Sequence, residues 1–294
     1  MRGSRFGAEV LRFRSYGWLS GPQHRRATHC IGARHNRRVT DAPAPRAVVA
    51  PDGIKIATYE WGDPDAPTVI AVHGFASSAL GNWNLTGWVR DLLKAGFHVI
   101  AIDQRGHGAS DKPHDPAQYR MTILADDVLA VLDTFLLDEV QYLGYSLGGR
   151  VGWKAAREFP DRISRAVLGG IPDGTPLTRF RVDQARRFVA DGTEPGDLLT
   201  ATYVGMAAGI PNNDLTALVS LVEGMQHGEQ PTPENAPGQP VLFATGSEDS
   251  ILEKSRALCA AAPDGRFFEI PGRNHFNAPT SRDFRDAAIA FLSS

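Results

Sequence analysis

The segment Gly144-Tyr145-Ser146-Leu147-Gly148-Gly149 has the spacing of a turn that presents a nucleophilic serine. It follows an apolar run of strand length, Val140-Gln141-Tyr142-Leu143, and a helix is predicted from about Leu147. In such a strand, turn and helix, the flanking glycines let neighbouring backbone approach closely, and the helix start offers N–H groups to a developing anion. The pattern indicates nucleophilic catalysis by Ser146. An ordinary turn with a helix-capping serine is the alternative interpretation.

A serine hydroxyl is a poor nucleophile at neutral pH and needs a base beside it. Nine histidines are present, and three of them lie in the N-terminal segment before residue 46. His275 instead directly follows the last strand-like run, Phe267-Phe268-Glu269-Ile270. Because reactive groups in α/β proteins lie in loops at the carboxyl ends of strands, His275 is the predicted base.

The base must in turn be oriented by an acid. The loop after the strand-like run Val241-Leu242-Phe243-Ala244 offers two adjacent carboxylates, Glu248 and Asp249. We predict that Asp249 has this role, with Glu248 as the local alternative and Asp173 as a distant one. The resulting order along the chain is serine, acid, histidine, which is the order expected of one hydrolase architecture.

Apolar runs and helical periodicities alternate between these loops. After a hairpin turned by Pro51-Asp52-Gly53, near-continuous apolar runs suit strands that are covered on both faces. Helical spacing recurs at about 88–93 and 122–137, so the alternation predicts a mostly parallel sheet with helices on both faces. The strand-like runs are 68–72, 98–102, 140–143, 163–168 and 241–244.

The alternation of strand-like and helical segments stops between Ile171 and Gly238, where no strand is predicted. Two helical stretches, at about 176–191 and 213–226, surround a segment that contains Tyr203 and Met206. We interpret 171–238 as a helical cap inserted over the sheet, with 47–170 and 239–294 as the core domain. Residues placed after one strand of the sheet must pack on its carboxyl end, which is where Ser146 lies.

Residues 1–46 hold ten arginines against two acidic residues, whereas the rest of the chain has 21 basic and 31 acidic residues. We expect a disordered basic extension, with an organellar transit peptide as one alternative and a tail for an anionic surface as another. The acidic body is a poor match for nucleic acid, and no membrane segment is expected. Two cysteines, Cys30 and Cys259, suit a reducing compartment, so a cytoplasmic location is predicted, or an organellar one if the extension is a transit peptide.

Two further segments complete a family resemblance. His73-Gly74-Phe75 follows the third strand, and Asp103-Gln104-Arg105-Gly106-His107-Gly108-Ala109-Ser110 has the pattern D-x-R-G-H-G-x-S. Together with the turn at Ser146, Asp249 and His275, they make residues 48–292 resemble the α/β-hydrolase superfamily. The resemblance implies a mostly parallel, eight-stranded sheet with helices on both faces and a helical cap.

The same resemblance implies an oxyanion hole formed by the backbone N–H groups of Phe75 and Leu147. Tyr145, Phe276, Tyr203 and Met206 are candidates for the substrate pocket. We expect His73 and His107 to be structural rather than metal ligands, and Asp103 and Arg105 to hold their loop by charge-assisted hydrogen bonds. No metal and no cofactor is expected.

The predicted activity is hydrolysis of small, largely apolar carboxylic esters by water through an acyl-enzyme on Ser146. Epoxide hydrolases and haloalkane dehalogenases of the fold use an aspartate where this chain has Ser146. Carbon–carbon bond hydrolases often place a tryptophan shortly after the histidine, where this chain has Phe276-Asn277-Ala278. Those hydrolases and cofactor-free haloperoxidases or perhydrolases remain enzymatic alternatives, and a non-catalytic small-molecule receptor is the alternative of another class. The oligomeric state is left open.

Overall fold

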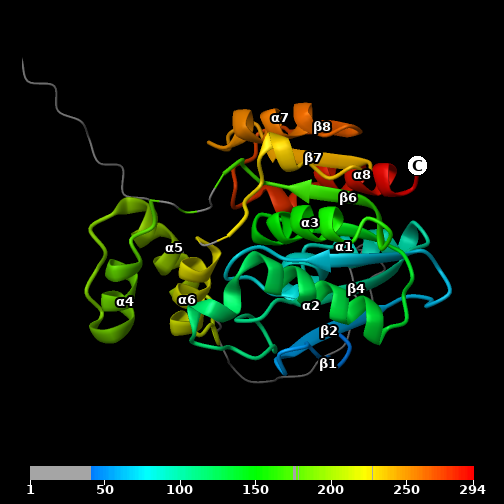
Figure 1. The fold of residues 1–294 in the computed structure, drawn as a ribbon. Helices are drawn as coiled ribbons and strands as arrows, with labels where there is room; N and C mark the ends of the chain where they lie inside the picture. Colours follow the sequence, from blue (N-terminus) through cyan, green and yellow to red (C-terminus); the bar gives the residue numbers. More distant parts are fainter. Residues whose placement is uncertain (1–40, 175–176, 178, 227) are drawn as a thin grey trace, which may run out of the picture. The chain divides into compact units, whose positions relative to one another are not determined.

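An eight-stranded sheet in the order β1-β2-β4-β3-β5-β6-β7-β8 underlies the fold (Figure 1). The computed structural model describes residues 41–294 except 175–176, 178 and 227. The predictions for residues 1–40, including most of the basic extension and Cys30, lie outside the described residues. The strands are β1 (Arg46–Val49), β2 (Lys55–Trp61), β3 (Thr68–Val72), β4 (His98–Asp103), β5 (Val140–Tyr145), β6 (Ile163–Gly169), β7 (Val241–Gly246) and β8 (Gly265–Ile270).

The pairing confirms the mostly parallel, eight-stranded sheet. Strands β3 to β8 pair in parallel, whereas β1 and β2 form the predicted hairpin and β2 pairs antiparallel with β4. Arg46, which the sequence analysis assigned to the extension, is instead the first residue of β1 and pairs with Thr58. A charged residue can begin this strand because β1 is an exposed edge strand, which tolerates charge on its outer face.

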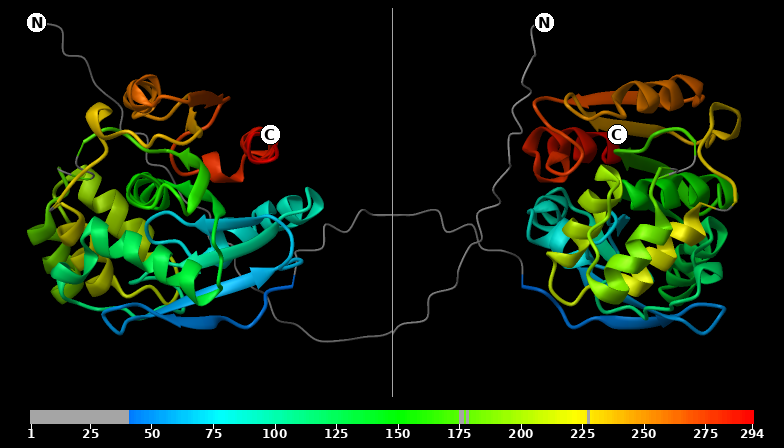
Figure 2. Two further views of the ribbon diagram at one scale, coloured as in Figure 1. Left: turned by 45° about the vertical axis from the view of Figure 1, so that its right-hand side comes forward. Right: turned by 90° about the vertical axis from the view of Figure 1, so that its left-hand side faces the viewer.

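Helices cover both faces of the sheet (Figure 2). Alternate residues of β3 point to opposite faces, so Ile70 and Val72 join the core under α2, α3 and α7, whereas Val69 and Ala71 join the core under α1 and α8. This two-sided burial explains the near-continuous apolar strands. The helices are α1 (Trp88–Lys94), α2 (Met121–Thr134), α3 (Leu147–Glu158), α4 (Val182–Asp191), α5 (Leu198–Ala208), α6 (Leu215–Met225), α7 (Leu252–Ala261) and α8 (Arg282–Leu292), with short turns η1 (Leu80–Asn84), η2 (Pro116–Tyr119), η3 (Pro233–Asn235) and η4 (Ala278–Thr280).

Three helices, α4, α5 and α6, lie between β6 and β7. The sequence analysis predicted only two helical stretches here, so α5 corrects that prediction. Its apolar residues surround the helix instead of forming a stripe, and the periodicity on which the prediction rested is therefore absent. The signal that was present is the N-cap, since the Asp197 carboxylate accepts the Thr200 backbone N–H at 2.8 Å. Helix α4 also begins later than predicted, at Val182.

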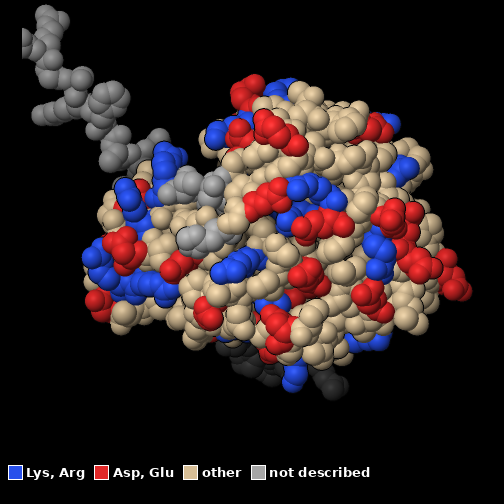
Figure 3. Space-filling model, viewed as in Figure 1, with Lys and Arg blue, Asp and Glu red and all other residues tan. Residues whose placement is uncertain are grey.

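Acidic and basic side chains are interspersed over the face seen in Figure 3. Basic groups are densest at the left, where Figure 1 places α4, whose arginines include Arg186 and Arg187. Both have acidic partners, Glu223 and Asp183 respectively, so this part of the surface is partly neutralised. No helix within the described ranges has the length and apolar character needed to cross a bilayer.

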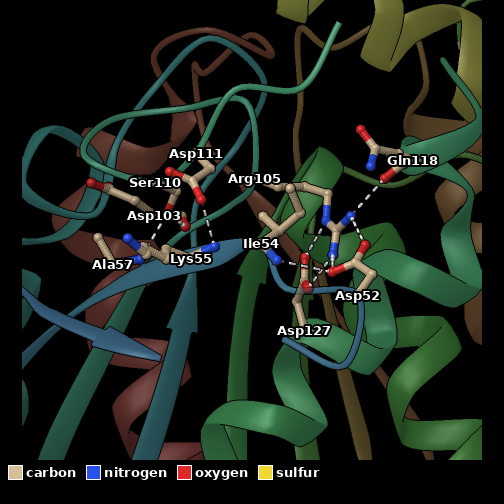
Figure 4. Close-up of polar contacts among 10 residues, drawn as sticks. All are labelled: Asp52, Ile54, Lys55, Ala57, Asp103, Arg105, Ser110, Asp111, Gln118 and Asp127. Atoms are coloured by element: carbon tan, nitrogen blue, oxygen red, sulfur yellow. Dashed lines mark hydrogen bonds and ion pairs between the residues drawn. The ribbon is translucent and has the colours of Figure 1, made fainter. Parts of the chain in front are cut away.

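Two buried charged residues, Asp103 at the end of β4 and Arg105 in the loop that follows, hold this loop in place (Figure 4). Asp103 accepts the backbone N–H groups of Ala79 at 2.7 Å and Ala109 at 2.8 Å. Arg105 donates two hydrogen bonds to Asp127, at 2.6 and 2.7 Å, and a third to Asp52 at 2.7 Å. These contacts fit the role expected of Asp103 and Arg105, because a bidentate guanidinium–carboxylate pair fixes both position and orientation.

Replacing Arg105 by Met should lower the free energy of unfolding by about 3–5 kcal/mol, because the Asp127 carboxylate then remains buried without a counter-ion. Urea denaturation followed by circular dichroism measures the change. The double variant Arg105→Met with Asp127→Leu should recover most of the loss. Arg187→Met, which removes an exposed arginine, should change stability by less than about 0.5 kcal/mol. Equal losses in the single and double variants would show that the ion pair is not the cause.

Candidate active site

The turn between β5 and α3 holds Ser146 in a strained backbone conformation, with φ 53° and ψ −110°. Such a positive φ is uncommon for a residue other than glycine, and strain of this kind gathers at functional sites. A Cβ on Gly148 would lie 2.0 Å from the Val72 carbonyl oxygen, and one on Gly144 would lie 2.3 Å from the Gly148 carbonyl oxygen. Both glycines are therefore required by close backbone contacts, as the sequence pattern indicated.

The structure brings together the three residues predicted to form the catalytic triad. Ser146 Oγ lies 2.9 Å from His275 Nε2, and His275 Nδ1 lies 2.8 Å from Asp249 Oδ2. Since the carboxylate can only accept, His275 donates from Nδ1, and its Nε2 is left to accept the Ser146 hydroxyl proton. The three side chains come from the loops after β5, β7 and β8, which all lie at the carboxyl ends of parallel strands.

The geometry also discriminates among the candidate acids. Asp249 is 7% exposed, whereas Glu248 is exposed to solvent and Asp173 pairs with Lys254 at 3.2 Å. The backbone N–H of Glu248 donates to the Arg273 carbonyl, which ties the β7 loop to the loop that carries His275. In this loop Asp249 is buried, whereas Glu248 faces solvent.

The backbone N–H groups of Phe75 and Leu147 donate to no protein acceptor within the described part of the chain. The next N–H group along the chain has an acceptor in each case. Gly148 N–H donates to the His73 carbonyl at 3.1 Å, and Ala76 N–H donates to His107 Nε2 at 3.0 Å. Two free donors that flank Ser146 can stabilise a negative charge that develops on a bound carbonyl oxygen. This arrangement supports the predicted oxyanion hole.

Similarity to known proteins extends over most of this chain. The family model of the alpha/beta hydrolase fold matches residues 67–195. A putative 2-succinyl-6-hydroxy-2,4-cyclohexadiene-1-carboxylate synthase of Bacillus subtilis is 30% identical over 273 residues, which cover 84% of this chain and 98% of that protein. The chain belongs to the α/β-hydrolase superfamily.

Two further similarities extend this result. Epoxide hydrolase A of Mycobacterium tuberculosis is 33% identical over 147 residues, which cover 50% of this chain and 44% of that protein. The chain thus spans less than half the length of some curated relatives that it matches. The crystal structure of the enol-lactonase from Burkholderia xenovorans LB400 superposes with a TM-score of 0.71 at 22% identity, over 85% of this chain and all of that one.

Ser146 and His275 of this α/β-hydrolase chain line a cavity of about 690 Å³ between the core loops and the cap. Phe276 and Tyr203, two of the predicted pocket residues, also line it. The rings of Phe75, Tyr203 and Phe276 form a chain of contacts, with centroids 5.8 and 6.1 Å apart. Apolar side chains from the cap and the β7 loop complete the wall: Leu177, Leu198, Leu199, Met225 and Ile251.

The other two predicted pocket residues, Tyr145 and Met206, line a smaller adjoining cavity of about 240 Å³. Tyr145 is only 3% exposed, and its hydroxyl donates to the His275 carbonyl at 2.7 Å. This bond holds the backbone of the predicted base, so Tyr145 both lines the cavity and positions His275. The sequence analysis missed Arg150, which lines the larger cavity, because its place four residues after Ser146 indicated proximity to the turn but not burial.

His73 and His107 pack against each other behind the predicted oxyanion loop, with ring centroids 4.9 Å apart. His73 donates from Nδ1 to the Gly74 carbonyl and accepts the Gln104 N–H at Nε2. His107 donates from Nδ1 to the Arg105 carbonyl and accepts the Ala76 N–H at Nε2. Every ring nitrogen is engaged with the backbone, which supports a structural role. Within the described residues, no cluster of three or more histidine, cysteine or acidic side chains suits a metal ion.

Burial lowers the pKa of both His73 and His107. Below about pH 6.5 the unfolded chain protonates both residues, whereas the folded protein keeps them neutral to a lower pH. Their stabilising contribution is therefore complete above pH 6.5, and it is lost as the pH falls below that value. Each histidine should contribute up to about 1.4 kcal/mol per pH unit to the slope of the unfolding free energy.

Urea denaturation between pH 7.5 and 5.5 measures this slope. The variant His107→Gln should have a smaller slope than the wild type, because glutamine does not titrate. A variant whose slope equals that of the wild type would contradict the assignment of buried neutral histidine at this position.

Proposed function

We propose that this protein is a serine hydrolase that cleaves carboxylic esters through an acyl-enzyme on Ser146. The observation that carries the proposal is the continuous hydrogen-bond chain from Ser146 Oγ through His275 to Asp249, which opens into the cavity beneath the cap. A hydroxyl, a base and an orienting acid in this order are the requirements for activating a serine.

In the proposed mechanism, His275 Nε2 takes the proton of the Ser146 hydroxyl as Oγ attacks the ester carbonyl. The negative charge that develops on the carbonyl oxygen is stabilised by the N–H groups of Phe75 and Leu147. Asp249 orients His275 and stabilises its protonated form. His275 then returns the proton to the leaving alcohol, and a water molecule activated by the same nitrogen releases the acid.

Among the related chemistries, the residue at the turn favours ester cleavage. Epoxide hydrolases of the fold use an aspartate there, and this chain has Ser146. Haloperoxidase or perhydrolase chemistry uses the same three side chains, so bromination of monochlorodimedone with peroxide and acetate separates that activity from simple ester hydrolysis. A receptor without catalysis would leave Ser146 unreactive.

A fluorophosphonate probe should label the wild-type protein at Ser146, and Ser146→Ala should not be labelled. On p-nitrophenyl esters of increasing chain length, Ser146→Ala should lower kcat by at least about 10³-fold, because the nucleophile is lost while binding remains. Mass spectrometry locates the label, and absorbance at 400 nm follows hydrolysis. Full esterase activity of Ser146→Ala would exclude the proposed nucleophile.

The two adjacent carboxylates provide a matched pair of variants. Asp249→Asn should reduce kcat by about 10⁴-fold, because the amide cannot hold His275 in the required tautomer. Glu248→Gln removes the same charge from an exposed position and should leave kcat within a factor of about 3. Steady-state kinetics on one p-nitrophenyl ester compare the two, and the opposite ranking would assign the acid to Glu248.

A further inference from the structure

Arg150 is a buried cation in the wall of the candidate active site. It lies on α3 four residues after Ser146, is 5% exposed and lines the larger cavity together with Ser146 and His275. Its Nη1 donates to the Gly174 carbonyl at 2.8 Å and to Gln230 Oε1 at 3.3 Å. Its Nη2 is buried and has no hydrogen-bond partner among the described residues. One edge of the guanidinium is thus anchored, and the other is free to donate.

The other buried cations of the described chain all contact carboxylates. Arg105 pairs with Asp52 and Asp127, Lys154 with Glu158 and Glu229, and Arg285 with Asp91. Buried charges in proteins are normally paired in this way, because removing an ion from water is costly. Among the residues that the structure describes, Arg150 is the buried cation that lacks such a partner.

The carboxylates that line the same cavity are already engaged. Asp249 contacts His275, and Asp173 lies 3.2 Å from Lys254 and acts on Arg150 only at longer range. Asp197 accepts both the backbone N–H and the hydroxyl of Thr200. Burial lowers the pKa of Arg150 to about 10, which still leaves the guanidinium protonated at neutral pH.

We propose that Arg150 binds a carboxylate of the substrate, so that the esters cleaved at Ser146 carry an acid group on their acyl part. The inference rests on the proposed function. It replaces the expectation of a largely apolar substrate by one with a single anionic end. An arginine suits this role because its planar donors match the geometry of a carboxylate.

The position of Arg150 limits the length of such a substrate. The Arg150 backbone N–H donates to the Ser146 carbonyl at 3.0 Å, so Arg150 lies in the first turn of α3 and Ser146 at its N-cap. We therefore expect the carboxylate and the scissile carbonyl to be separated by only a few carbon atoms. Tyr203 lines the same cavity, so its phenol hydroxyl is a second candidate donor to the proposed anion.

Paired alkyl esters test the proposal on the wild-type protein. Monoethyl succinate, glutarate and adipate are compared with ethyl butanoate, pentanoate and hexanoate by titration of the released acid. We expect kcat/KM for the best acid ester to exceed that for its neutral counterpart by at least about tenfold, with the optimum at the shorter chains. Free glutarate should also slow fluorophosphonate labelling of Ser146.

Three variants locate the effect. Arg150→Met should lower the ratio of kcat/KM for acid and neutral esters by about 10- to 100-fold, and Arg150→Lys should give an intermediate ratio because it keeps the charge but loses the planar donors. Arg187→Met is the control, since it removes an exposed arginine of α4 and should leave the ratio unchanged. Labelling of Ser146 in each variant reports whether the site is folded.

The outcomes separate this inference from the proposed function. A wild-type protein that is labelled at Ser146 but cleaves neutral esters as well as acid esters, with no protection by glutarate, overturns the role of Arg150 alone. A wild-type protein that is never labelled refutes the proposed function. In that event, a rise in Tm with glutarate that Arg150→Met abolishes would still support the anion site, and its absence would reject it. If Arg150→Met fails to fold, the wild-type comparison decides.

Discussion

The close backbone contact between the turn at Ser146 and strand β3 is the constraint on which the rest of the site depends. The space next to Gly148 is filled by the Val72 carbonyl, so this turn can pack only if no side chain is present there. The contact holds Ser146 at a positive φ and carries its hydroxyl out of the sheet. The Gly148 N–H also donates to the His73 carbonyl, which joins the turn that carries Leu147 to the segment that leads to Phe75.

Buried polar residues then fix the loops around this turn. Asp103 binds the backbone near η1 and the end of its own loop, and His73 and His107, which pack edge to face, join the β3 loop to the β4 loop. Each of these groups satisfies backbone N–H or carbonyl groups that would otherwise be buried without partners, which would be costly. The irregular backbone of these loops is therefore held in shape by charged and polar side chains, whereas apolar packing is sufficient under the helices.

The predicted cap, helices α4 to α6, supplies part of the cavity wall. Its helix α5 brings Tyr203 and Met206 over the two cavities, and Asn213 donates to the Ala76 carbonyl, which fastens the cap to the loop that holds Phe75. Most of the wall is apolar, and among the described residues Arg150 is its buried cation without a carboxylate partner, which makes Arg150 the proposed group for orienting a substrate. One apolar contact changes the discrimination between substrates only slightly, whereas a buried polar group that must be paired discriminates strongly between substrates with and without its partner.

The sequence by itself determined the sheet, the turn at Ser146 and the order of the three residues proposed as a catalytic triad. Strands that are buried on both faces consist almost entirely of apolar residues, so apolar runs of strand length predict them. Reactive side chains are then expected in the loops that follow these strands. His275 could be chosen in this way from nine histidines, and the same reasoning directed the search for the acid to the loop with Glu248 and Asp249.

Tertiary structure alone decided the rest. Asp249 and Glu248 are adjacent and chemically alike, and only the packing of the β7 loop on Arg273 points one inward. Helix α5 has no amphipathic stripe, since both the core and the cavity lie beside it. From the sequence, Arg150 cannot be distinguished from any other charged residue of a helix. Its burial and its lack of a counter-ion depend on residues far away along the chain. Local patterns specify elements, whereas the pairing of a charge is a property of the whole assembled site.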